Sequence, residues 1–273
     1  MASERAVGDQ YRLTEDERRG FDQDGWIRLP GFLAEAELAE LERVYMAMLR
    51  REIPVAGRDY CDMSGDYSRP IEEFALLNVM LPRRYHPALV GNVYERRAGD
   101  VARQLLGDDM VLDYDQFVAK PPRKADAVFH WHQDLGYWPI TDDTRTASFW
   151  LALDDTRLDN GCLRFVRGSH KEAELRPHLP LHDDRERSHA LVATVDEATE
   201  LLDVAELRRG DVTVHHERAV HGSGGNTSQR WRRGYVVAFR SQATVAAERA
   251  QGFTHSHNDD VEVLNYIARR AGA

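Results

Sequence analysis

The sequence predicts an α+β chain in which N-terminal helices support an antiparallel barrel or double sheet. In roughly the first 107 residues, apolar side chains recur at helical spacing. After Gly107 the chain consists of short runs rich in Val, Phe, Trp, Tyr and Thr, separated by Gly or Asp clusters. No helix-length pattern alternates with these runs, which disfavours a parallel βαβ sheet.

Two segments of the first part carry the helical pattern. Apolar residues between Leu33 and about Arg51 lie on one helical face, with Pro30 before the segment and Pro54 after it. A second pattern covers 92–106, and Gly107 stands where a glycine commonly ends a helix.

The second part contains β-type runs at 110–119, 146–153, 162–166, 211–216 and 234–240. Residues 172–203 are charged and irregular, so we expect a long insertion near the mouth of the barrel. A short apolar pattern at 261–270 predicts a C-terminal helix packed on its own chain or on a partner.

Composition narrows the class of protein. The 273 residues carry a net charge of −10, so we do not expect nucleic acid or an acidic membrane as a partner. Cys61 and Cys162 are too few for a disulfide scaffold, and the first residues lack a signal-peptide pattern. The longest apolar-leaning stretch, 147–153, is far shorter than a membrane span. These features predict a soluble, cytoplasmic protein.

A His-x-Asp pair stands in the most chemically dense stretch of the chain. In an extended segment, His132 and Asp134 point to the same side, and His130 could join them. The best candidate for a third ligand is His221, which follows the run at 211–216 and precedes glycines. Two imidazoles and one carboxylate on three corners of an octahedron are typical of non-haem Fe(II) oxygenases. A lone His-x-Asp also occurs by chance, so its neighbours matter.

An arginine cluster follows His221. If the chain turns after Gly222 and returns antiparallel, Arg232 comes back beside the metal strand, where its guanidinium could hold a dicarboxylate through two hydrogen bonds. We interpret Arg230 and Arg233 as part of a solvated charged face.

At this point the chain resembles the phytanoyl-CoA dioxygenase family of Fe(II)/2-oxoglutarate oxygenases. The resemblance covers about 112–239 well and the N-terminal helices loosely, and several motifs occur in the family's order. They are Lys120-Pro121-Pro122, His132-Gln133-Asp134 with Tyr137-Trp138, Asn160-Gly161-Cys162-Leu163, Gly168-Ser169-His170-Lys171, Gly210-Asp211-Val212 and His221-Gly222-Ser223-Gly224.

The resemblance implies a double-stranded β-helix, a jelly roll of two packed sheets, over about 108–241. It also implies that His132, Asp134 and His221 bind Fe(II), and that Arg232 and Ser223 hold the far carboxylate of 2-oxoglutarate. Lys120 and Trp150 match cosubstrate-pocket positions, and Gln116, two residues before Val118 on the same strand face, is expected to face the pocket. Because the site residues extend from Lys120 to Arg232, one domain over 1–273 is favoured, with its helical part at about 1–107.

Aromatic residues cluster around the expected ligands and predict walls of a substrate pocket. The candidates for substrate contact are His130, Trp131, Tyr137, Trp138 and Tyr114. Strand alternation allows only one of His215 and His216 to face inward. We interpret His170 as a structural turn residue, and His178, His182, His189, His255 and His257 as surface residues.

The resemblance implies oxidation of an unactivated C–H bond of a small molecule with 2-oxoglutarate and O₂. The outcome is hydroxylation, or radical epimerisation, cyclisation or desaturation. Asp134 argues against a halogenase, because halogenases of this class lose the carboxylate. Bacterial members often tailor secondary metabolites such as polyketides, and the aromatic pocket would suit a flat substrate. The sequence leaves open a monomer or a homodimer.

Three alternatives remain at this stage. An acyl-CoA hydroxylase is disfavoured because its phosphates would require a basic channel and the chain is acidic. A non-oxidative Zn or Mn enzyme on a cupin-like barrel gives Arg232 no role. A binding protein without turnover has no need of an intact His-x-Asp…His set.

Overall fold

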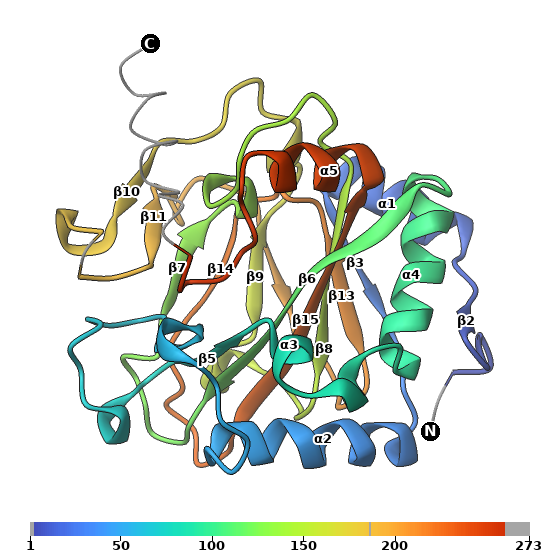
Figure 1. Cartoon of the computed structure of the whole chain (residues 1–273). Helices are drawn as coiled ribbons and strands as arrows, with labels where there is room; N and C mark the ends of the chain where they lie inside the picture. Colours follow the sequence, from blue (N-terminus) through green and yellow to red (C-terminus); the bar gives the residue numbers. More distant parts are fainter. Residues whose placement is uncertain (1–2, 186, 260–273) are drawn as a thin grey trace.

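Two antiparallel sheets form the centre of the structure, a computed structural model that describes residues 3–185 and 187–259 (Figure 1). The predicted helix at 261–270 lies outside the described residues. The larger sheet has the order β3-β13-β8-β15-β6-β5-β4. Its strands are β3 (Trp26–Leu29), β13 (Val212–His215), β8 (Thr146–Ala152), β15 (Arg232–Ser241), β6 (Met110–Lys120), β5 (Leu77–Met80) and β4 (Tyr60–Asp62).

The smaller sheet faces the larger one and has the order β12-β9-β14-β7. Its strands are β12 (Leu202–Ala205), β9 (Leu163–Val166), β14 (His221–Ser223) and β7 (Phe129–His132). All pairings in both sheets are antiparallel. The prediction of a jelly roll of two packed antiparallel sheets is therefore confirmed, and each of the five predicted runs contains an observed strand.

Two hairpins lie outside the sheets. One pairs β1 (Ala6–Val7) with β2 (Gln10–Tyr11), and the other pairs β10 (His178–Pro180) with β11 (Leu191–Ala193). The second hairpin lies within the predicted insertion at 172–203, which is otherwise irregular, as expected.

Helices cover the outer face of the larger sheet (Figure 1). The α-helices are α1 (Glu15–Asp24), α2 (Glu35–Leu49), α3 (Pro82–Tyr85), α4 (Val93–Leu106) and α5 (Gln242–Ala250). Single 3₁₀ turns occur at η1 (Gly57–Asp59), η2 (Ile71–Glu73), η3 (Pro87–Leu89), η4 (Asp134–Gly136), η5 (Leu158–Asn160), η6 (Ser169–Lys171) and η7 (Leu181–Asp183).

Both predicted helices are present, and local chemistry explains their ends. The Asn92 side chain accepts a hydrogen bond from the backbone amide of Glu95 at 3.0 Å and caps α4, which ends at Gly107 with a φ of 112°. Buried Arg97 of α4 donates to both carboxylate oxygens of Glu37 at 2.7 and 2.9 Å, so this pair joins α4 to the start of α2.

The prediction of a mainly helical first part is incomplete. Strand β3 pairs with β13 along the far edge of the larger sheet, and β5 pairs with β6 and carries β4. These N-terminal strands extend the same sheet that the C-terminal strands build. We propose on this ground that the chain forms one domain.

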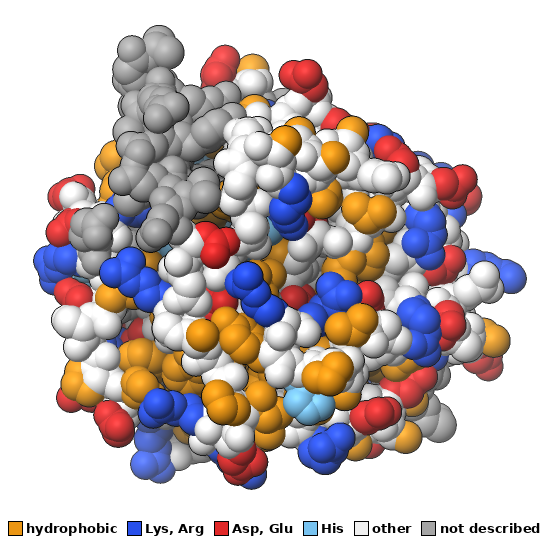
Figure 2. All heavy atoms as spheres, viewed as in Figure 1, with side chains coloured by type: hydrophobic (Ala, Val, Ile, Leu, Met, Phe, Trp, Pro, Cys, Tyr) orange, Lys and Arg blue, Asp and Glu red, His pale blue; other side chains and the backbone are white. Residues whose placement is uncertain are grey.

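The surface visible in Figure 2 mixes acidic and basic side chains, and neither sign forms a continuous patch on that face. This face therefore offers no broad basic strip to a polyanion. In the part of the chain that the structure describes, no helix is both long and apolar enough to cross a membrane.

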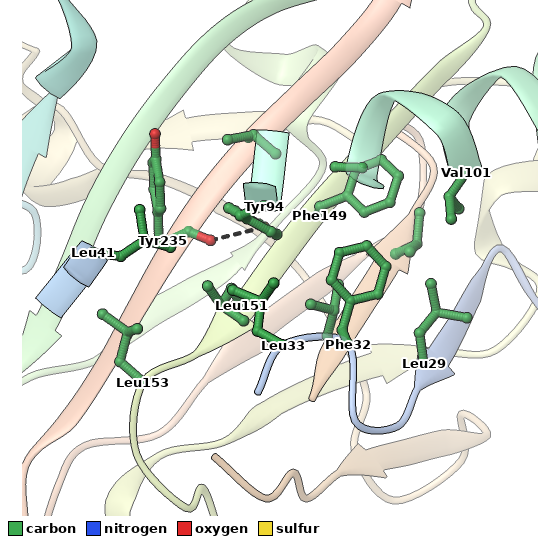
Figure 3. Close-up of a cluster of buried hydrophobic side chains, with 14 of the residues drawn as sticks. Leu29, Phe32, Leu33, Leu41, Tyr94, Val101, Phe149, Leu151, Leu153 and Tyr235 are labelled. Carbon is green, nitrogen blue, oxygen red and sulfur yellow. Dashed lines mark hydrogen bonds between the residues drawn. The ribbon is translucent and has the colours of Figure 1, made fainter. Parts of the chain in front are cut away.

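Side-chain alternation gives the larger sheet two different faces. Phe149 and Leu151 of β8 and Tyr235 of β15 pack against the helices, where the hydroxyl of Tyr94 donates to the carbonyl of Tyr235 at 3.0 Å (Figure 3). Trp150 of β8, between Phe149 and Leu151 in sequence, instead faces the smaller sheet, as does Val236 of β15. The outer face thus forms the main core, and the inner face is available for a site.

Candidate active site

Three buried side chains lie close together in the space between the two sheets. His132 at the end of β7 lies directly opposite His221 at the start of β14, and Asp134 follows two residues after His132 at the start of η4. The Nε2 atoms of His132 and His221 each lie 3.6 Å from Oδ1 of Asp134. One atom from each side chain lies within 4.8 Å of the other two, which suits a single metal ion.

Backbone carbonyls orient both imidazoles. Nδ1 of His132 lies 2.7 Å from the carbonyl oxygen of His130, and Nδ1 of His221 lies 2.9 Å from that of Ala219. These hydrogen bonds place the proton on Nδ1 and leave the Nε2 lone pair directed at the common point, as a metal ligand requires. Burial, with the neighbouring imidazoles of His132 and His215, lowers the pKa of His221 well below its usual value, which keeps it neutral.

Asp134 is ionised in this setting. The Oγ of Ser148 donates to Oδ2 of Asp134 at 2.9 Å, and a hydrogen bond of this kind favours the carboxylate over the carboxylic acid. The three side chains therefore present two neutral nitrogens and one negative oxygen.

Two buried cations lie on neighbouring strands near the cavity, where Arg232 lines it and Lys120 contacts the lining residue Ser223 without lining the cavity itself. Arg232, 1% exposed, begins β15 opposite Lys120, the last residue of β6, as the predicted antiparallel return requires. The Nζ of Lys120 donates to Oγ of Ser223 and to the carbonyl oxygen of Gly224, each at 2.6 Å. Burial and the nearby charge of Arg232 lower the pKa of Lys120 well below its usual value, and burial lowers the pKa of Arg232 to about 10.

The guanidinium of Arg232 fits an anion. Its carbon lies 4.3 Å above the ring of Trp150, which fixes the plane of the group. Within the described residues, its Nε and Nη2 atoms have no hydrogen-bond partner although both are buried. Buried donors of this kind are costly unless a ligand accepts from them, and a carboxylate accepts two parallel hydrogen bonds.

A cavity lies between the two sheets, and aromatic, apolar and a few polar side chains line it, as is usual for a small-molecule site. Predicted residues Tyr114, Gln116, Trp150, Ser223 and Arg232 line it together with the three candidate ligands. The sequence interpretation did not include other lining residues, namely Val118, Phe129, Leu163, His215, Gly222 and Val236.

The remaining predicted substrate residues differ in position. Tyr137 packs edge-on against His132, with ring centroids 5.6 Å apart, and Trp138 packs edge-on against Tyr114 at 5.5 Å. Trp131 requires a correction, because it lies on the opposite face of β7 from His132. Its Nε1 donates to Glu197 at 2.9 Å, and Arg164 lies over its ring at 4.7 Å, so it is not a pocket wall. The side chain of His130 is half-buried and does not line the cavity.

The insertion reaches the site, as expected from its position in the sequence. Nε2 of His178 accepts from the backbone amide of Gln133 at 3.0 Å, and the hydroxyl of Tyr137 accepts from the amide of Leu191 at 2.7 Å. His178 therefore holds the segment between the two β7-side ligands and is not a simple surface residue.

His255 is a second correction among the histidines. The sequence places it on the surface, but it is buried, and its Nε2 lies 2.8 Å from Oδ2 of Asp113. Its ring stacks on Tyr114 with centroids 4.8 Å apart. Of the two adjacent histidines, His215 faces the cavity and His216 does not, as alternation requires.

The comparisons with known proteins agree with this geometry. A profile described as Phytanoyl-CoA dioxygenase (PhyH) matches residues 21–234. The chain belongs to the phytanoyl-CoA dioxygenase family. This dioxygenase is 27% identical over 231 residues to a probable alpha-ketoglutarate-dependent hypophosphite dioxygenase of Stutzerimonas stutzeri, covering 82% of this chain and 77% of the relative.

Two solved structures share the fold of this dioxygenase. The alpha-ketoglutarate-dependent carbocyclase SnoK from nogalamycin biosynthesis is 23% identical, with a TM-score of 0.67 over 86% of this chain and 87% of that one. EvdO2 from Micromonospora carbonacea var. aurantiaca, complexed with 2-oxoglutarate, is 25% identical, with a TM-score of 0.68 over 86% and 94% of the two chains. The predicted family, fold, enzyme class and cofactors (iron, 2-oxoglutarate and O₂) are thereby confirmed.

Proposed function

We propose that this dioxygenase uses Fe(II), 2-oxoglutarate and O₂ to oxidise an unactivated C–H bond of a small molecule in secondary-metabolite tailoring. The observation that carries the proposal is the presence, in one buried cavity, of three convergent ligand atoms and a buried guanidinium with free donors.

The iron ligands in this proposal are His132, Asp134 and His221. Two imidazole nitrogens and a carboxylate oxygen suit Fe(II), and three protein ligands leave other positions open for cosubstrate and O₂. In the bound state, hydroxylation converts a C–H bond, 2-oxoglutarate and O₂ into an alcohol, succinate and CO₂. The protein positions the target carbon and excludes water.

The 2-oxoglutarate site in this proposal is formed by Arg232, Ser223 and Lys120. Arg232 binds the far carboxylate of 2-oxoglutarate by donating hydrogen bonds from its free Nε and Nη2 atoms. Lys120 donates to the Ser223 hydroxyl oxygen at 2.6 Å, which leaves the hydroxyl proton of Ser223 free for the carboxylate. Trp150 keeps the guanidinium plane in place, and Gln116 lines the same cavity.

The proposed substrate is an uncharged molecule with rings. Besides Trp150, the cavity is lined by Tyr114, Phe129 and Leu163. Among the described lining residues, Arg232 is the one guanidinium, so the cosubstrate leaves no lining arginine for the phosphates of an acyl-CoA. Similarity to SnoK, from nogalamycin biosynthesis, supports antibiotic tailoring. Epimerisation and cyclisation use the same ligands and the same cosubstrate.

The non-oxidative Zn or Mn alternative is less favourable. It leaves the buried Arg232 donors without an assigned partner, and a buried cation with free donors is expensive to keep. The cytoplasmic location and a monomeric or homodimeric state stay predictions.

Anaerobic titration with Fe(II) and 2-oxoglutarate tests the proposal. We expect a weak visible metal-to-ligand charge-transfer band when both Fe(II) and 2-oxoglutarate are present. Neither compound alone should produce this band. Succinate should form after admission of O₂, slowly without substrate. A protein that binds Zn(II) or Mn(II) but develops neither band nor succinate would refute the oxygenase function.

A further inference from the structure

The two carboxylate oxygens of Asp134 have different surroundings. Oδ1 lies 3.6 Å from Nε2 of both His132 and His221, at the point where the three ligand atoms converge. Oδ2 points away from that point and accepts a hydrogen bond from Oγ of Ser148 at 2.9 Å. It also lies 3.3 Å from Nε2 of His215. One oxygen is thus presented to the metal, and the other is held by protein.

Ser148 and His215 form a cross-strand pair. Ser148 of β8 lies directly opposite His215 of β13 in the register of the larger sheet. Both are buried, at 0% and 3% exposure. The smaller sheet carries the two histidine ligands on β7 and β14, so the carboxylate between them is held from the larger sheet.

His215 has an arrangement that core packing alone does not require. Its ring packs against those of Phe165 and His221, with centroids 5.5 and 4.3 Å away. Its Nδ1 is buried and has no hydrogen-bond partner within the described residues. Its Nε2 faces the carboxylate of Asp134. An apolar ring at this position would avoid the unpaired nitrogen, which costs about 1–3 kcal/mol.

We infer that Ser148 and His215 are positioning residues that keep Asp134 a one-oxygen ligand. An unrestrained carboxylate can rotate and bind through both oxygens. It would then take a fourth position of an octahedron, and the two left would not accommodate both a chelating 2-oxoglutarate and O₂. Hydrogen bonds to Oδ2 oppose that rotation and also orient Oδ1, as outer partners of metal ligands do. This inference rests on the proposed iron site.

The test compares Fe(II) binding by metal-free variants. His215→Phe removes the N–H but keeps a ring beside Phe165, and Ser148→Ala removes the hydroxyl. We expect each to raise the Kd for Fe(II) by about 10- to 100-fold, measured by anaerobic titration. His215→Gln, which retains an N–H donor, should recover part of the affinity. The charge-transfer band with 2-oxoglutarate should shift in His215→Phe, because the ligand field changes.

The matched control is Thr213→Val. Thr213 is buried two residues before His215 on β13, and its hydroxyl has no partner within the described residues. This variant should bind Fe(II) like the wild type. Thermal unfolding of each metal-free protein separates positioning from folding, since the inference predicts lost affinity in proteins that melt within a few degrees of the wild type.

Two outcomes are distinguishable. If His215→Phe and Ser148→Ala bind Fe(II) as tightly as wild type and give the same band, the positioning role is wrong while the iron site stands. If the wild type itself binds no Fe(II), the proposed function fails first and the positioning role with it.

Discussion

Two buried clusters of histidine and carboxylate differ in what already surrounds them. The ligand cluster consists of His132, Asp134 and His221, and the ionic cluster consists of Asp113, Glu248 and His255. In both, candidate ligand atoms lie within 4.8 Å of one another.

Arginines neutralise the ionic cluster. Arg240 pairs with Glu248 and lies 3.4 Å from Asp113, and Arg249 also pairs with Asp113. His255 directs its Nε2 at Asp113, so that nitrogen is already engaged. In the ligand cluster, the structure records no ion pair of Asp134 with arginine or lysine within the described residues, and both ligand histidines use Nδ1 for their hydrogen bonds.

Proximity of donor atoms therefore does not by itself make a metal site. The ligand cluster carries an excess negative oxygen and two free lone pairs that face a cavity, whereas the ionic cluster has its own cations. We expect substitutions in the ligand cluster to weaken metal binding, and substitutions in the ionic cluster to lower the stability of the fold.

The largest expected effect is in the ligand cluster. Asp134→Ala should abolish the charge-transfer band and weaken Fe(II) binding by at least a hundredfold, because it removes the one charged ligand. Asp113→Asn is the matched change in the ionic cluster and should leave the Kd for Fe(II) of folded protein unchanged. Anaerobic titration of both variants checks this, and loss of Fe(II) binding in folded Asp113→Asn would contradict the distinction.

The second effect is on stability. Arg240→Met leaves Glu217, Glu248 and Asp113 without their shared buried cation, and breaking such a network costs about 3–5 kcal/mol. Urea unfolding should show this loss. Arg19→Met removes an exposed pair with Asp16 and should change stability by less than about 1 kcal/mol. Equal losses in the two variants would mean that the ionic cluster does not stabilise the fold.

The third effect concerns the cosubstrate. Arg232→Met should raise the Kd for 2-oxoglutarate about 100-fold, the loss expected for two charge-assisted hydrogen bonds. Arg230→Met is the control, because Arg230 is half-exposed and pairs with Asp159 at 2.9 Å. Titration at saturating Fe(II) distinguishes the two arginines, and an unchanged Kd in Arg232→Met would remove the cosubstrate role of this residue.

The smallest effect is the pH dependence of the ionic cluster. Burial raises the pKa of Glu248 to about 7, although Arg240 and Arg249 oppose the rise. Between its ordinary value near 4.5 and about 7, folded protein therefore binds more protons at this site than unfolded protein, and stability falls as pH rises. His255, whose pKa burial lowers, acts in the opposite direction, so the comparison with Glu248→Gln is needed.

We expect the stability of the wild type relative to Glu248→Gln to decrease by on the order of 2 kcal/mol from pH 5 to pH 8. Urea unfolding at several pH values measures it. A difference that stays constant would show that Glu248 ionises at its ordinary pKa, and one that increases with pH would show that folding lowers this pKa; either result contradicts the prediction.

Local patterns were sufficient where a residue's role depends on its own strand. Alternation predicted that Gln116 faces the pocket, and the return of the chain after Gly222 predicted Arg232 beside the metal strand. The cap at Asn92 and the end at Gly107 bounded α4.

Local sequence patterns could not predict which segments pair when they lie far apart in the chain. Strand β3 has four residues, and its place at the sheet edge depends on β13, which lies about two thirds of the chain length later in the sequence. His255 is buried because Asp113 lies opposite, 142 residues before it. Trp131 lies on the outer face of β7, where Arg164 of β9 and Glu197, both distant in sequence, contact it. Ser148 could have been found, since it stands two residues before Trp150 on the same face of β8.

The opposite placement of His132 and His221 has a mechanical consequence. Strand β7 is the last strand of the smaller sheet and is hydrogen-bonded there to β14 alone. A divalent ion bound by both histidines becomes a cross-link between these two strands at the edge of the sheet. Opening of β7 then requires release of the ion. Amide hydrogen exchange along Phe129–His132 should therefore become slower as the metal concentration increases, and its rate reports the fraction of protein that has bound metal.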